Sequence, residues 1–227
     1  MSKRTTTSKP PRGAAAEATR TALTLTGLSL FGRQGFEGTS TREIAAAANA
    51  NIGSIAYHFG GKDGLREAVA DHIVATIQMI AAQALEAAPK PPEDAAGAQE
   101  QLTSAIHNMV DFVVVQPEAG DIVQFILREM AQPSPALDRI YNGVFDPVHR
   151  RLCAIWELAT GEPAESDRTK LTVFTMLGQI IYFRIGKEAV LRRMGWTDIG
   201  KREAGMITEA ARDNLNAIIA SRTGGKS

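Results

Sequence analysis

The sequence predicts an all-α fold, with a tri-helical N-terminal module followed by a larger helical domain. Apolar residues recur at helical spacing through most of the chain. No segment combines sustained alternation of apolar and polar residues with enrichment in β-branched residues, the pattern typical of a strand. Most prolines stand between the apolar periodic segments, where they separate one helix from the next.

The composition is that of an ordinary globular chain of 227 residues, 44% hydrophobic and 22% charged. No apolar run reaches the roughly 18 residues that a membrane span needs. No apolar stretch follows the basic residues at the start, so we expect neither a secretory signal nor a membrane partner. The single cysteine, Cys153, excludes an internal disulfide framework and favours a cytoplasmic location.

Charge is divided unevenly along a chain whose formal net charge is zero. Residues 1–66 contain nine Lys and Arg against four Asp and Glu, a net charge of +5, and the remainder carries −5. This division indicates that only the N-terminal part faces a polyanion such as nucleic acid.

The N-terminal segment 1–13 is rich in Thr, Ser, Lys and Pro, and is predicted to be a flexible basic arm. A helix is predicted at 14–34, ended by Gly35. Its apolar stripe comprises Ala18, Ala22, Leu25, Leu28, Leu30 and Phe31. Two short helices are predicted next, at 41–48 and from 51 or 52 to 59, and then a long helix at 62–88.

A linker is predicted at 89–97, PKPPEDAAG, because three prolines cannot lie in a helix interior. Beyond it, helices are predicted at 98–115, 118–131, 135–159, 166–186, 187–193 and 202–221. Pro147 falls inside one of these segments, so we expect that helix to kink or restart there.

The segment 35–65, GFEGTSTREIAAAANANIGSIAYHFGGKDGL, carries the most informative pattern. Ser40 and Glu43 have the spacing of a capping box, which predicts a helix start at Thr41. Asn49 stands in the following tight turn, where it can adopt a left-handed conformation. Gly60 and Gly61 end the second short helix.

Two short helices joined by a tight turn, after a longer helix, form a tri-helical DNA-binding module. Small residues at Gly53, Ser54 and Ala56 leave the second helix flat enough to enter a major groove about 12 Å wide. Arg42 stands at a helix N-terminus that flanks this groove, so we expect it to contact DNA.

The same residues resemble the N-terminal signature of the TetR family. The match comprises Arg20, Leu30-Phe31, Gly35-Phe36, residues 39–45, Gly53, residues 57–59, Lys62 and Leu65. The variant ANANIGSIAYHFGGKDGL, with the later segments REMAQPSPAL and LGQIIYFRI, is similar to the CecR-like subgroup. Asn49 stands where the family usually has glycine.

This resemblance implies roles for individual residues. Asn51, Ile52 and Ser54 are expected to face bases, and Gly53 lies among them. Thr41, Tyr57, His58 and Lys62 are expected to hold phosphates. The aromatic members of this set have an alternative interpretation as core residues.

In the C-terminal half, large side chains with polar neighbours are candidates for a ligand pocket. Core and pocket are lined by the same residue types, so both interpretations stay open for each of them. The ligand-binding residues we predict are Phe112, Phe125, Arg128, Tyr141, Trp156, Gln179 and Tyr182.

The helix at 166–186 is apolar nearly all round, which predicts one face for its own core and one for a second subunit. The helix at 202–221 adds a stripe of Ile207, Ala211, Leu215 and Ile218. Together they predict a symmetric homodimer with a four-helix interface.

No catalytic motif and no cofactor site is expected. The pairs Asp146 with His149 and His107 with Asp111 supply too few ligands for a metal site.

The sequence therefore predicts a ligand-responsive transcriptional regulator, not an enzyme. Its parts are an arm at 1–13, a helix-turn-helix domain at 14–60, and a ligand-binding and dimerisation domain at 61–227. Its partners are double-stranded operator DNA, a small-molecule effector that releases it through the helix at 62–88, and a second copy of the chain. The alternatives are a helical metal- or small-molecule-dependent enzyme with a vestigial DNA-binding module, and a DNA-binding scaffold without an effector.

Overall fold

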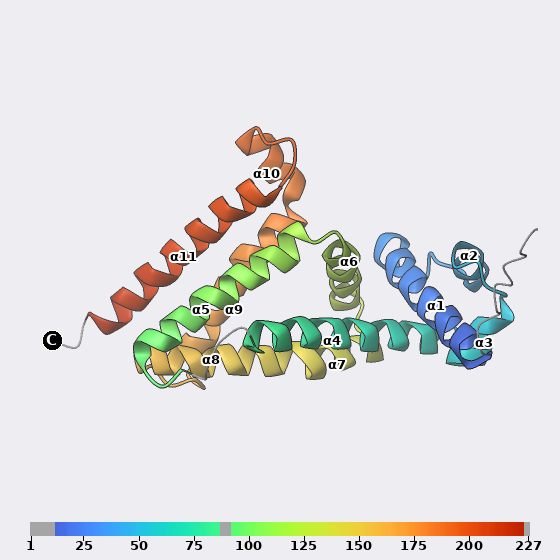
Figure 1. The fold of residues 1–227 in the computed structure, drawn as a ribbon, viewed down its shortest axis with the longest axis horizontal. Helices are drawn as coiled ribbons and strands as arrows, with labels where there is room; N and C mark the ends of the chain where they lie inside the picture. Colours follow the sequence, from blue (N-terminus) through green and yellow to red (C-terminus); the bar gives the residue numbers. More distant parts are fainter. Residues whose placement is uncertain (1–11, 87–91, 225–227) are drawn as a thin grey trace, which may run out of the picture. The chain divides into compact units, whose positions relative to one another are not determined.

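The computed structural model describes residues 12–86 and 92–224, which form helices and connecting turns without any strand (Figure 1). The all-α prediction is confirmed. The predicted arm, apart from Arg12 and Gly13, lies outside the described residues, as do 87–91. The helices are α1 (Arg12–Gln34), α2 (Thr41–Ala47), α3 (Gly53–Phe59), α4 (Lys62–Glu86), α5 (Ala95–Val110), α6 (Glu118–Ala131), α7 (Pro135–Ile140), α8 (Asp146–Thr160), α9 (Asp167–Ile185), α10 (Lys187–Met194) and α11 (Lys201–Thr223). Two π-helical turns, η1 (Asp111–Val115) and η2 (Tyr141–Phe145), lie between them.

The chain divides into two compact units, each with its own apolar interior. The first unit runs up to His72 and also includes Gln124–Leu137. The second unit comprises Ile73–Val123 and the chain from Asp138 onward. The boundaries fall within α4, α6 and α7, so these three helices contribute residues to both units.

In the first unit, α1 packs against α2 and α3. The interior is built from fully buried aliphatic and aromatic side chains, chiefly Leu23, Phe31, Ile44, Ile55 and Leu65. The predicted stripe of the first helix was wrong at Leu25, which is 46% exposed, whereas Leu23 is fully buried. The two residues differ by about 200° around a helix of 3.6 residues per turn, so only one of them can face α2 and α3.

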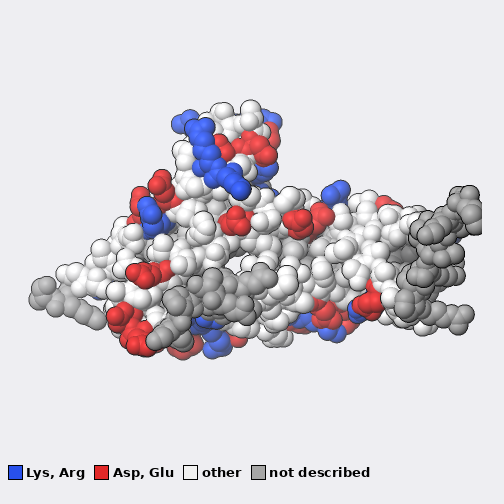
Figure 2. Space-filling view, viewed as in Figure 1, with Lys and Arg blue, Asp and Glu red and all other residues white. Residues whose placement is uncertain are grey.

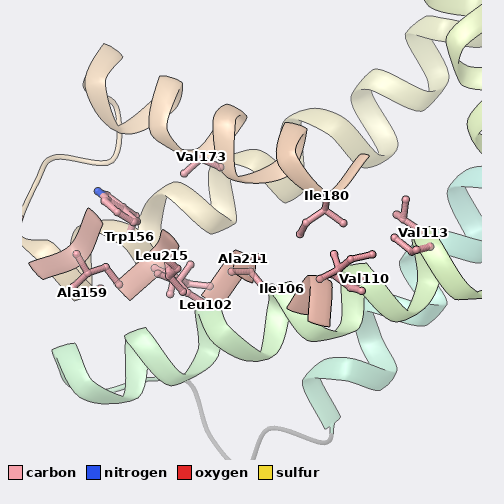
Figure 3. Close-up of a cluster of buried hydrophobic side chains, with 14 of the residues drawn as sticks. Leu102, Ile106, Val110, Val113, Trp156, Ala159, Val173, Ile180, Ala211 and Leu215 are labelled. Atoms are coloured by element: carbon pink, nitrogen blue, oxygen red, sulfur yellow. The ribbon is translucent and has the colours of Figure 1, made fainter. Parts of the chain in front are cut away.

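In the second unit, α5, α8, α9 and α11 pack around one apolar cluster. Leu102, Trp156, Val173, Ile180 and Leu215 are among its buried members and come from all four helices (Figure 3). Leu215, part of the stripe predicted for a subunit interface, and Ile180 of the predicted helix at 166–186 therefore lie in the core of their own chain.

Near Pro147, where a kink or a restart was predicted, the π-helical turn η2 lies between α7 and α8, and α8 begins at Asp146. Proline has no N–H, so the carbonyl of Gly143 loses its helical donor four residues on. Gln78 of α4 supplies a donor instead, with Nε2 at 3.1 Å from that carbonyl oxygen. α5 begins at Ala95, inside the segment predicted as a linker, because the Asp94 carboxylate accepts from the amide of Gly97 at 2.8 Å.

Charged residues of both signs are scattered over the face seen in Figure 2, and they gather around α10. Lys187, the first residue of α10, pairs with Asp198 at 2.6 Å. Within the described residues, no helix is long and apolar enough to cross a membrane.

Candidate nucleic-acid interface and ligand cavity

The first short helix of the tri-helical module begins at a side-chain cap. Ser40 Oγ accepts a hydrogen bond from the amide of Glu43 at 3.1 Å. The reciprocal half of the predicted capping box is replaced, because Glu43 Oε1 accepts from Gln34 Nε2 of α1 at 2.8 Å. The Glu43 carboxylate thus ties α2 to the end of α1.

The turn between the two short helices contains a left-handed residue, as predicted. Asn49 has a φ of 52°, and it is the one non-glycine residue of the described chain with positive φ. The second helix begins at Gly53, just beyond the predicted start at 51 or 52, and Asn51 Oδ1 accepts from the amide of Gly53 at 2.9 Å. Gly60, with a φ of 75°, ends that helix in a left-handed C-cap.

One face of α3 is buried and the other is open to solvent. Ile55 is 2% exposed and holds the helix in the module, whereas Tyr57 is 81% exposed and Ile52 is 49% exposed. The exposure of Tyr57 excludes its interpretation as a core residue. Asn51 and Gly53 are also exposed, while Ser54 and His58 are half-buried.

The helices next to α3 place polar and basic side chains at their N-termini. Thr41 is half-buried and Arg42 exposed at the start of α2. Lys62 begins α4, and its Nζ lies 4.1 Å from the centroid of the Phe36 ring. The Arg66 guanidinium lies 4.4 Å from the same ring. Contact with an aromatic face restrains these cations at one end of the module.

Two residues predicted to bind a ligand lie in the first unit. Phe125 is 1% exposed and packs 6.5 Å from Phe31, ring centroid to centroid. Arg128 Nε donates to the carbonyl of Gly32 and its Nη2 to that of Arg33, both at 2.7 Å. Arg128 thereby satisfies carbonyls at the C-terminus of α1, which a helix leaves without internal donors.

The second unit contains a cavity of about 280 Å³. It is lined by 21 residues of α4, α5, η1, α8, α9 and α11, four of them polar: Gln101, Ser104, Asn108 and Arg151. Phe112 and Trp156, of the predicted ligand-binding set, are on its wall. The other lining residues are Ile77, Ile80, Ala81, Leu102, Ala105, Ile106, Met109, Val148, Leu152, Ile155, Val173, Met176, Leu177, Ile180 and Leu215.

The remaining predicted ligand residues lie elsewhere in the second unit. Tyr141 and Tyr182 are 52% and 53% exposed, and neither lines the cavity. Gln179 accepts from Asn214 Nδ2 at 2.9 Å and so links α9 to α11.

Trp156 is held in place on the cavity wall by a charge-assisted hydrogen bond. Its indole Nε1 donates to Glu162 Oε2 at 3.0 Å. In Figure 3 the indole nitrogen lies at the edge of the cluster, while the ring packs among the apolar side chains. Glu162 also lies near Arg168 and Arg222, at 3.4 and 3.6 Å. The ring orientation is therefore set by a polar network outside the cavity.

Sequence reasoning missed most of the wall, because aliphatic residues carry no signal that separates cavity from core. One signal was available in the predicted helix at 98–115: Gln101, Ser104, Asn108 and Phe112 are spaced to fall on one helix face. Half-buried Gln101 and Asn108 on the same face as Phe112 are polar side chains that line the cavity.

The helix α9 has an apolar face that the second unit covers only in part, with the Phe174 ring stacked on His149 of α8 at 4.0 Å between centroids. It comprises Leu171, Phe174, Gly178, Tyr182 and Ile185, and Phe174 and Leu171 are 58% and 65% exposed. A Cβ at Gly178 would meet nothing within 4 Å, so a second backbone can approach closely there. Within the described residues, no group of three or more His, Cys, Asp or Glu could hold a metal ion.

An exposed helix after a left-handed turn, on a tri-helical module joined to a cavity-bearing helical unit, defines the class of one-component DNA-binding regulators. Residues 23–69 match the model of the tetR family of bacterial regulatory proteins. Residues 98–222 match the C-terminal domain of the HTH-type transcriptional dual regulator CecR. The chain belongs to the TetR family and shares the C-terminal domain of CecR. It is a DNA-binding transcriptional regulator.

Individual proteins agree with this assignment. The HTH-type transcriptional dual regulator CecR of Shigella flexneri is 31% identical over 207 residues, 89% of this chain and 92% of the relative. A transcriptional regulator from Pseudomonas aeruginosa PAO1 has the same fold, with a TM-score of 0.63 and 21% identity over 91% of this chain and 94% of its own. AibR, in complex with isovaleryl coenzyme A and operator DNA, also has this fold, with a TM-score of 0.60 and 14% identity over 90% and 98% of the two chains.

Proposed function

We propose that the protein is a cytoplasmic repressor that binds a palindromic operator as a homodimer and leaves it when a small molecule fills the cavity. The observation that carries the proposal is the open face of α3, where Tyr57 and Ile52 are 81% and 49% exposed. Both belong to the segment that matches the tetR family model, so their exposure supports a binding surface there. In this family of DNA-binding regulators, the partner of that surface is the major groove.

Base contacts fall to the exposed N-terminal end of α3, with Asn51, Ile52, Gly53 and Ser54. Asn51 Oδ1 is engaged with the amide of Gly53, so its Nδ2 is the atom that remains for a base. Thr41, Arg42, Tyr57, His58 and Lys62 surround this end and supply phosphate contacts. Phosphate contacts orient the module, and base contacts choose the sequence.

The second copy covers the exposed apolar face of α9. Leu171, Phe174 and Ile185 are all more than half exposed in one chain, and Gly178 permits close approach of a partner helix. A two-fold axis through this face makes the interface isologous. The two α3 helices then read half-sites about 34–36 Å apart.

The effector occupies the cavity of the second unit. Seventeen of its 21 lining residues are apolar, so the ligand has a largely apolar body. Helix α4 lines the cavity with Ile77, Ile80 and Ala81 and begins at Lys62, so it contributes to both sites. A ligand that binds the DNA-incompetent state about a hundredfold tighter supplies about 2.7 kcal/mol of coupling, and operator DNA must weaken ligand binding by the same factor.

A gel-shift assay with the DNA upstream of the protein's own gene tests the DNA-binding part. Lys62→Ala should weaken binding to every sequence alike, and the slope of affinity against salt should fall by about one unit per lost contact. Ser54→Ala should change the preference among operator variants instead. Lys62→Ala with unchanged affinity at about 0.1 M salt would remove Lys62 from the interface.

Release and dimerisation are tested separately. Ala105→Trp fills the cavity and should abolish ligand-induced release while leaving operator affinity intact. If the protein is a DNA-binding scaffold without an effector, no variant should show ligand-induced release. If it is an enzyme with a vestigial module, no specific gel shift should appear.

Phe174→Arg should give a monomer in sedimentation. A dimer in this variant would show that the interface does not include this face of α9.

A further inference from the structure

We infer that the cavity selects an uncharged apolar ligand that donates one hydrogen bond to the side chain of Gln101. The inference rests on the proposed function, since it names the ligand class of the same site.

The carbonyl oxygen of the Gln101 side chain is buried and accepts no hydrogen bond from any described residue. Buried polar atoms are almost always paired, so each exception needs a physical reason. The only other such atom of the described chain, Arg222 Nε, lies 3.6 Å from Glu162 Oε1 and is compensated by that charge. Gln101 Oε1 has no comparable compensation.

Gln101 is also one of the four polar residues on the cavity wall. Ser104 and Arg151 are exposed, so water satisfies their polar groups. Gln101 and Asn108 are half-buried, and the other seventeen lining residues are apolar. The terminal torsion of a glutamine side chain is broad, so the carboxamide can meet a ligand in the cavity without movement of α5.

An unpaired acceptor is satisfied by a hydroxyl or an N–H, not by a carboxylate, which only accepts. A charged ligand would also lose its hydration among apolar side chains, and burial of an unpaired charge is unfavourable. The complementary ligand is therefore an apolar body with one donor, such as a phenol or an alcohol. Arg128, which the sequence offered as a ligand-binding residue, donates to the carbonyls of Gly32 and Arg33 in the first unit.

Three probes of one shape test this in the full-length protein by calorimetry: 2-naphthol, which has a donor, 2-methylnaphthalene, which has none, and 2-naphthoate, which is anionic. We expect 2-naphthol to bind at least about tenfold tighter than 2-methylnaphthalene. Gln101→Leu should remove this preference. The matched control Gln124→Leu, at an exposed position on α6, should retain it.

Each other outcome overturns the inference in a distinct way. Equal affinity for 2-naphthol and 2-methylnaphthalene would leave a ligand site without a role for Gln101. Tightest binding of 2-naphthoate would assign selection to Arg151. Failure of all three probes to bind would remove the proposed ligand site itself, and the gel shift would still test DNA binding.

A measurement without ligand provides a second test. Because Gln101→Leu removes an unpaired buried acceptor, the ligand-free variant should melt at or above the temperature of the wild-type protein. A lower melting temperature would show that Gln101 already has a partner in the folded chain, and the inference would be wrong.

Discussion

Arg66 Nε donates a 2.7 Å hydrogen bond to Glu129 Oε1, and this ion pair joins α4 to α6 within the first unit. The Glu129 side chain is 3% exposed, and its second oxygen accepts from Ser134 Oγ at 2.5 Å. Both oxygens of a buried carboxylate are therefore satisfied. The arrangement explains why the segment around Glu129, far along the chain from α1, belongs to the unit that holds the DNA-binding module.

Glu129→Ala should lower the free energy of unfolding by about 3 kcal/mol, because it leaves the Arg66 guanidinium without its carboxylate in a largely buried position. Urea denaturation measures the change. Glu100→Ala, at an exposed position on α5, is the control and should have little effect. A loss below about 1 kcal/mol for Glu129→Ala would mean that solvent compensates Arg66.

Arg128→Ala should destabilise the protein by about 1 kcal/mol, since two carbonyls at the end of α1 lose their donors. Arg128→Lys should recover only part of this, because an ammonium lacks the planar fork that meets both carbonyls. Arg193→Ala, exposed on α10, is the control for loss of an arginine charge. The affinity for 2-naphthol should be unchanged in Arg128→Ala. A large loss of that affinity would indicate that Arg128 does contribute to ligand binding.

Asn49→Ala should cost about 1 kcal/mol of stability, because a φ of 52° is unfavourable for a residue with a Cβ and no local hydrogen-bonding side chain. Asn49→Gly should be close to neutral, since glycine adopts this conformation freely. Thermal denaturation of the two variants gives the comparison. Equal stability of the two variants would show that the turn relaxes around alanine.

Gly143→Ala should destabilise the second unit by about 1–3 kcal/mol, because the new Cβ would lie 2.6 Å from Val74 Cγ1. In a Val74→Ala background the same change should be neutral or stabilising, since alanine favours a helix over glycine. The double-mutant cycle measures this coupling. Additive effects would place the cause outside the contact between the two residues.

Cys153 should react slowly with a thiol reagent in the native protein. Its side chain is buried, and burial raises the pKa of the thiol above its ordinary value. The nucleophilic thiolate is therefore scarce in the folded chain near pH 8. Ellman's reagent should modify one thiol per chain rapidly in urea and slowly without it. Rapid native labelling would indicate frequent local opening of α8.

The DNA-binding end of the protein was predictable because short-range interactions determine it. Ser40, Asn49 and Gly60 act on backbone groups within a few residues, so their roles follow from residue type and spacing. One detail depended on a neighbouring helix: the Glu43 carboxylate accepts a hydrogen bond from Gln34 of α1, where the capping box would have it accept from the backbone of Ser40.

The ligand cavity was less predictable, because helical periodicity shows that a face is buried without showing what covers it. Phe112 and Phe125 are equivalent in the sequence, as large aromatic residues on amphipathic helices. The structure places Phe112 on the cavity wall and Phe125 against Phe31 in the first unit.

By itself, the sequence determined the all-α class, the family, the order of the helices, and the turn that presents α3. These features depend on local propensity, capping and periodicity, and each of those is determined by residues close together in the sequence. Only the tertiary structure decided that Arg128 serves α1, that Ile180 and Leu215 belong to the core of their own chain, and that Gln101 has no partner. The physical reason is that such roles depend on which atoms from distant helices come into contact. A contact between segments far apart in the chain produces no periodic pattern in the sequence.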